Sequence, residues 1–83
     1  MTWRWEYDPS EEHVAGGAPP AFVADVEQAA DELVRAAEAL YLGGTAYREM
    51  GPKGAVMNLD DGMFVYLIIP RSECVYIRQV TYL

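Results

Sequence analysis

Five side chains in the second half of the chain are the ones best suited to chemistry on a phosphate. They are Arg48, Lys53, Arg71, Arg78 and Tyr82. Arginine and lysine neutralise phosphate oxygens, and a tyrosine ring stacks on a base or acts on a leaving group. If these residues share one face of a sheet, they would hold RNA. The alternative is that they are spaced surface residues and that Tyr82 packs against a helix.

Two further residues have reactive side chains but lack the neighbours that their chemistry needs. His13 is the one histidine of the chain and lies among acidic residues, whereas a metal site requires several ligands. Cys74 is the one cysteine, and a nucleophilic thiol requires nearby positive charge, usually with a histidine. We therefore expect a solvated histidine and a buried strand cysteine, and we predict no metal and no cofactor.

The charge of the chain is negative and unevenly distributed. The net charge is −7, and residues 1–42 hold nine acidic and two basic residues, whereas residues 43–83 hold four of each. Nucleic-acid binding depends on basic charge, so the balance argues against RNA except at a local site in the second half. No apolar run approaches the roughly 20 residues of a membrane helix. The start of the chain does not resemble a signal peptide, and the single cysteine fits a reducing compartment, so we predict a cytoplasmic protein without membrane contact.

The elements that must position these side chains begin with a short aromatic strand. Trp3, Trp5 and Tyr7 alternate with polar residues, which predicts a strand whose aromatic face packs in the core rather than stacking on bases. Residues 8–20 are rich in proline, glycine and acid, and we expect a loop. A helix is predicted from Pro19-Pro20 to Gly43-Gly44, either continuous or bent into two. Its apolar stripe consists of Phe22, Val26, Ala29, Leu33, Ala37 and Leu40.

The second half of the chain predicts three strands. They cover residues 54–59, 63–69 and 74–82, with a hairpin turn at Asp60-Asp61-Gly62, where Asp-Gly accepts positive φ. Residues 63–69 are apolar throughout, as expected for a central strand covered on both faces. The alternation of the last strand shifts at Gln79-Val80, which indicates a bulge. We expect one α+β domain over residues 1–83, a small antiparallel sheet of order β-α-β-β-β with one long or two short helices on one face.

This order, together with three segments, resembles the RelE/ParE superfamily of toxin–antitoxin toxins. The segments are the aromatic first strand, the central run Met63-Phe64-Val65-Tyr66 and the terminal strand through Thr81-Tyr82. The resemblance implies a RelE/ParE-like fold and, for the ribonuclease branch, metal-independent cleavage of messenger RNA by attack of the 2′-hydroxyl on the adjacent phosphate. Carried over by position, the family's central-strand arginine falls at Met63, and its histidine-tyrosine pair falls at Thr81-Tyr82. Its glutamate before the meander matches Glu49 loosely.

Two functions follow from this sequence, beside a small-ligand pocket between helix and sheet that no particular residue supports. The first is a protein of a toxin–antitoxin type system that lacks the full ribonuclease set and acts through protein contacts. Its partner would be an antitoxin or another basic protein bound by the acidic half, or a strand or second copy paired at the sheet edge. The alternative is an active endoribonuclease that uses Arg48, Lys53, Arg71 and Arg78 for phosphate and Tyr82 for the leaving group.

Overall fold

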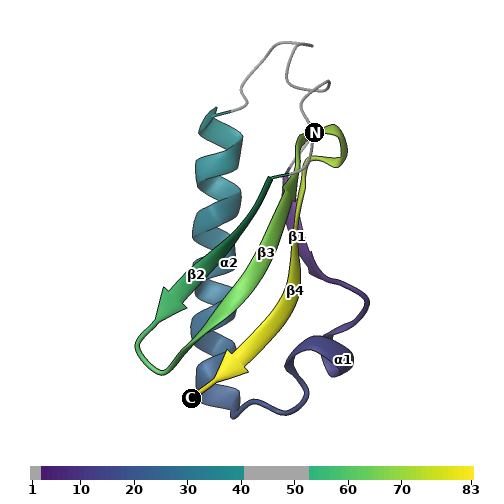
Figure 1. Ribbon diagram of the computed structural model, residues 1–83. Coiled ribbons are helices and arrows are strands. Elements are labelled where there is room, and N and C mark those ends of the chain that lie inside the picture. The colour runs from purple at the N-terminus through teal and green to yellow at the C-terminus, as the bar shows by residue number, and fades with distance from the viewer. Residues whose placement is uncertain (1–2, 41–52) are drawn as a thin grey trace.

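The computed structural model describes residues 3–40 and 53–83 and confirms the α+β class. A short strand and two helices come first, and a three-stranded meander follows (Figure 1). The elements are β1 (Arg4–Tyr7), α1 (Glu11–Ala15), α2 (Pro20–Leu40), β2 (Lys53–Leu59), β3 (Gly62–Ile69), the 3-10 turn η2 (Pro70–Ser72) and β4 (Cys74–Tyr82). None of the described helices is long and apolar enough to cross a membrane.

The sheet is mixed rather than wholly antiparallel. Its strand order is β1-β4-β3-β2, with antiparallel pairing from β2 to β4 and parallel pairing of β1 with β4. The expectation of a purely antiparallel sheet is therefore wrong at β1. The reason is the long connection: the chain between β1 and β4 passes through the helices and two hairpin strands, which is ample for a parallel neighbour. In this strand order, β1 and β2 are the two edge strands of the sheet.

The long helix forms as one continuous element of 21 residues along one face of the sheet (Figure 1). Phe22, Val26, Ala30 and Ala37 are buried against the strands. The apolar stripe is confirmed except at its end. Leu40 is 73% exposed, because the described core ends one helical turn earlier, where Ala37 packs with Trp3 and Val75. Burial of this stripe, rather than helix propensity alone, stabilises the helix.

The aromatic residues of β1, and Trp3 directly before it, pack against the helix as predicted. Trp3 is buried, and Trp5 and Tyr7 are half-buried and meet edge-to-face with ring centroids 5.1 Å apart. Each half-buried ring also keeps a polar partner on α2. The Trp5 indole donates a hydrogen bond to Asp31 at 2.8 Å, and the Tyr7 hydroxyl donates one to Glu27 at 2.9 Å. These rings are therefore core residues whose polar ends are satisfied by helix carboxylates.

The predicted loop over residues 8–20 contains a helix, α1, which corrects that expectation. The Ser10 side chain caps it by accepting the backbone N–H of His13 at 3.2 Å. Glu11 and Glu12 lie at its positive N-terminal end, which stabilises even a short helix. Val14 is buried with the α2 side of the core. Two buried residues, Val14 and Ala15, and a good cap thus outweigh the proline and glycine content of the segment.

The β2–β3 hairpin has the predicted place but not the predicted backbone. Leu59 pairs with Gly62, so Asp60 and Asp61 form a two-residue turn. Gly62 has no positive φ, and Glu73 is the one non-glycine residue in the described chain that does. Glycine is needed at position 62 for space: a Cβ there would overlap the Thr81 carbonyl oxygen and lie 2.7 Å from Phe22 Cζ. Close packing around position 62, rather than a left-handed backbone conformation there, therefore requires glycine.

Candidate interaction surface

The structure distributes the predicted phosphate-binding residues along the sheet instead of grouping them. Arg71 is exposed in η2, at the end of the sheet where β4 begins, and Tyr82 is the last residue of β4. The eight residue steps of β4 span about 27 Å, so these two side chains lie far apart. Lys53 is the first residue of β2, opposite Ile68 and thus toward the Arg71 end. Arg48 lies outside the described residues.

Arg78 is the bulged residue of β4. Val65 pairs with Gln79 and Tyr66 pairs with Ile77, so Arg78 is left without a partner on β3. The bulge is thus one residue before the predicted position. The exposed Arg78 guanidinium lies 3.5 Å from the Asp8 carboxylate, which offsets part of its charge. The bulge therefore turns this arginine toward the chain's own acid, which weakens it as a phosphate ligand.

Tyr82 packs on the helix and is still partly accessible. Its ring meets Phe22 edge-to-face with centroids 5.2 Å apart, as expected for packing on the helix. It nevertheless remains 51% exposed, so an outside molecule can reach it. A role for Tyr82 on a substrate stays a prediction, because no other member of the predicted site is placed beside it in the described chain.

Cys74 is fully buried at the start of β4, as predicted. Burial raises the pKa of its thiol, which keeps it protonated near neutral pH. Its Sγ lies 3.7 Å from the Val75 carbonyl oxygen. A protonated, enclosed thiol is a poor nucleophile, so Cys74 serves the core.

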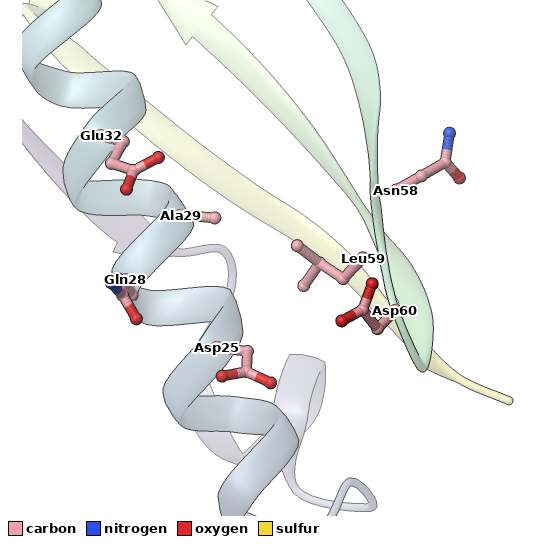
Figure 2. A pocket seen from close by; sticks show the side chains of 7 residues that line it. All are labelled: Asp25, Gln28, Ala29, Glu32, Asn58, Leu59 and Asp60. Atoms are coloured by element: carbon pink, nitrogen blue, oxygen red, sulfur yellow. The ribbon is translucent and has the colours of Figure 1, made fainter.

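A groove of about 330 Å³ runs between α2 and the β2–β3 hairpin (Figure 2). In Figure 2 Asp25 and Glu32 lie on the helix side of the groove and Asp60 on the hairpin side, with Ala29 and Leu59 pointing toward each other across it. Three carboxylates at one groove repel phosphate and favour cationic groups. This side of the molecule therefore argues against RNA. Among the described residues, no group of acidic, histidine or cysteine side chains is arranged to hold a metal ion.

Sequence reasoning missed that the second face of the sheet is open. The buried strand residues Phe64, Val75 and Ile77 all pack toward α2, while most apolar residues on the other face remain partly exposed. Cys74, which pairs with Ile69 on that face, is buried. We call this second face the open face; its apolar residues are Val56, Met63, Val65, Leu67, Ile69 and Tyr76. The prediction that residues 63–69 are covered on both faces is thus wrong within the described part of the chain. The unbroken apolar run was the available signal, because it also fits a face covered by another molecule.

The outer edge of β2 borders this face. β2 is at one end of the strand order, and no described strand pairs with its outer side. Val56, at its centre, is 51% exposed and pairs with Val65 across the inner side. An apolar face that ends at an unpaired strand is a combination suited to contact with another protein.

No family model, curated protein or solved structure matches this chain. What the protein does has to be inferred from the geometry of its own residues.

Proposed function

We propose that this chain is a RelE/ParE-like cytoplasmic protein of a toxin–antitoxin type system that acts through protein contacts and not by RNA cleavage. The observation that carries the proposal is the open face with its apolar row ending at exposed Val56. Large apolar patches on a small protein usually mark interaction sites. The observed order of one strand, two helices and a three-stranded meander is compatible with the order β-α-β-β-β from which we propose the resemblance.

The second support is the chemistry at the positions that the ribonuclease branch would use. Met63 and Thr81 stand directly opposite each other on β3 and β4. Under the proposed resemblance, they correspond by position to the family's arginine and histidine. A thioether and a hydroxyl supply neither the positive charge nor the proton exchange that a phosphate transition state requires. The loss therefore affects two neighbouring positions at once.

The chemistry of the partner follows from charge. The acidic groove at Asp25, Glu32 and Asp60 and the net charge of −7 favour a basic protein, such as an antitoxin, or a basic segment of one. RNA, which is itself an anion, fits this surface poorly.

The proposal is tested by expressing the chain together with the product of a reading frame adjacent to its gene. We expect the two products to copurify as a complex of fixed stoichiometry. The complex should weaken at least tenfold when Val65→Lys places a charge in the open face, while Ala24→Lys, which adds the same charge at an exposed position of α2 outside the groove lining, should leave it intact. No complex with any neighbouring product would count against the proposal.

The endoribonuclease alternative predicts a different result in the same host. Induced expression alone would arrest growth, and Tyr82→Phe or Arg78→Ala would relieve the arrest. We expect normal growth and uncut ribosome-bound message for the wild-type chain. Growth arrest that depends on Tyr82, with cleaved message, would overturn the protein-contact proposal.

A further inference from the structure

β2 lacks the features that normally protect an edge strand. Natural edges carry charged side chains, proline or bulges that prevent pairing with other chains. From Gly54 to Leu59 the strand has no proline and no charged residue, and its pairing with β3 runs without a register shift over all seven positions. The described structure therefore presents a straight edge, uncharged from Gly54 to Leu59, whose outer side pairs with no described strand.

The sequence of β2 is suited to pairing with itself. In an antiparallel pair centred on Val56, Ala55 stands opposite Met57 of the second copy and Gly54 opposite Asn58. Residues that pair in this way lie on the same face of the sheet, so the open faces of both copies become continuous. The exposed Val56 side chains then meet each other, and each also borders Val65 of its own chain.

Charge favours this register over a parallel arrangement. With Val56 opposite Val56, Lys53 of one copy stands opposite Leu59 of the other, beside Asp60. The two-fold axis repeats this lysine–aspartate neighbourhood at the other end of the strand pair. It also keeps the two acidic grooves at opposite ends of the pair, because each groove lies at its own Asp60 end. Parallel pairing would place lysine beside lysine and aspartate beside aspartate.

We infer that two copies of this chain associate through antiparallel pairing of β2 with β2, centred on Val56, to form one continuous eight-stranded sheet. This inference rests on the proposed function, which assigns the chain a role in protein contacts, and it specifies one of those contacts. Stable dimers bury about 800 Å² per partner, which a seven-residue strand alone does not reach. The dimer should therefore be reversible and depend on protein concentration.

Sedimentation velocity from about 1 µM to about 1 mM protein tests the inference. The wild-type chain should pass from monomer to dimer with rising concentration. Val56→Lys should shift the midpoint at least tenfold upward, whereas Ala36→Lys should not. Circular dichroism establishes that each variant is folded. A wild-type chain that stays monomeric at the highest concentration, or a dimer indifferent to Val56→Lys, would overturn the inference.

A cross-linking test gives a positive signal that does not depend on a destabilised variant. Directly opposed residues of an antiparallel pair have Cα atoms about 4.5–5.5 Å apart, within the range of a disulfide. Under mild oxidation, Val56→Cys should form a covalent dimer rapidly, while Ala36→Cys should remain monomeric. The native Cys74 is buried and does not compete. Equal cross-linking of both variants would contradict pairing at Val56.

Charge exchange tests the register itself. Lys53→Glu and Asp60→Lys should each weaken self-association, because each places like charges together. An equal mixture of the two single variants should associate as well as the wild type, since every lysine–aspartate neighbourhood then again joins opposite charges. If the mixture is as weak as either variant alone, the register is wrong. The outcomes remain separate from the proposed function: a monomer that still binds its partner refutes only the dimer, and growth arrest with cut message refutes only the protein-contact proposal.

Discussion

Gly62 occupies a position where β4 and α2 leave no room for a side chain. A Cβ there would overlap the Thr81 carbonyl oxygen and approach Phe22 Cζ to 2.7 Å. Both neighbours are fixed, one in a strand and the other in the core. We therefore expect Gly62→Ala to lower the free energy of unfolding by about 2–3 kcal/mol, the cost typical of overpacking. Urea denaturation followed by circular dichroism measures the change.

Gly54 is the matched control for Gly62. It also lies in the hairpin, but a Cβ there would meet Leu67 Cδ1 at 3.5 Å and the Tyr66 carbonyl oxygen at 3.6 Å, which are ordinary contacts. Gly54→Ala should leave stability unchanged or raise it by about 0.5 kcal/mol, because alanine loses less chain entropy on folding. Equal losses in the two variants would show that crowding is not what selects glycine at position 62.

Tyr7 gives the protein a pH dependence in the alkaline range. Burial and the hydrogen bond to Glu27 raise the pKa of Tyr7 above its ordinary value. The unfolded chain therefore ionises first, so the contribution of Tyr7 to stability is complete below about pH 10 and declines as the pH rises toward the higher folded pKa. Between about pH 9 and 11, the urea midpoint of the wild type should fall more steeply than that of Tyr7→Phe.

Comparison of the two proteins isolates Tyr7 from the other groups that titrate nearby. The pKa of Cys74 is raised by burial, and the pKa of Tyr76 is raised chiefly by the charge of Cys74. Ionisation of both groups therefore lowers stability at alkaline pH. The effect is common to the wild type and to Tyr7→Phe, so it cancels when the two proteins are compared. Parallel pH profiles for the two proteins would mean that the Tyr7–Glu27 contact has no influence on folding.

At the scale of elements, β1 depends on α2 as much as on the sheet. The strand pairs with β4 over only four residues, and the hydrogen bonds of Trp5 to Asp31 and Tyr7 to Glu27 join it to the helix one helical turn apart. We expect Trp5→Phe combined with Tyr7→Phe to accelerate amide exchange in β1 about tenfold while β2 and β3 stay protected. Uniform acceleration over all strands would instead indicate global destabilisation.

The elements that sequence predicted well are those with many repeats of one period. The stripe of α2 repeats over five helical turns, and the strands of the meander alternate between clear turn residues. The direction of β1 was not predictable in this way, because a parallel and an antiparallel strand have the same alternation. The five-residue α1 is too short for any period and depends on the Ser10 cap.

The candidate site was less predictable than the fold because it depends on register. The spread of Arg71, Arg78 and Tyr82 follows from the length of β4 and from a bulge at one residue, and a shift by one residue exchanges the faces of a strand. The open face was hidden for another reason. The apolar residues of β3 predict burial on both sides, but a sequence does not reveal whether the second cover comes from the same chain or from another.

At the scale of the whole molecule, negative charge opposes the compact state. The net charge is −7, and Asp25, Glu32 and Asp60 face one groove. The ion pairs Arg4–Glu6 and Arg78–Asp8 are both exposed and contribute little. Salt screens the repulsion between negative charges over the whole surface. The stability gained in this way should exceed the stability lost when the exposed ion pairs weaken. We expect Tm at neutral pH to rise by about 3 °C between low and moderate sodium chloride.

Glu32→Gln tests whether the groove is a source of that repulsion. The amide keeps the shape of the side chain and removes one of the three facing charges. Tm should therefore rise at low salt, and the further increase on adding salt should be smaller than in the wild type. Glu12→Gln is the control, because it removes the same charge from α1, outside the groove. Glu12 lies at a helix N-terminus, where a negative charge is favourable, so this substitution should lower stability instead. Thermal denaturation at low protein concentration keeps self-association out of the measurement, and equal effects of the two variants would assign the salt dependence to net charge alone.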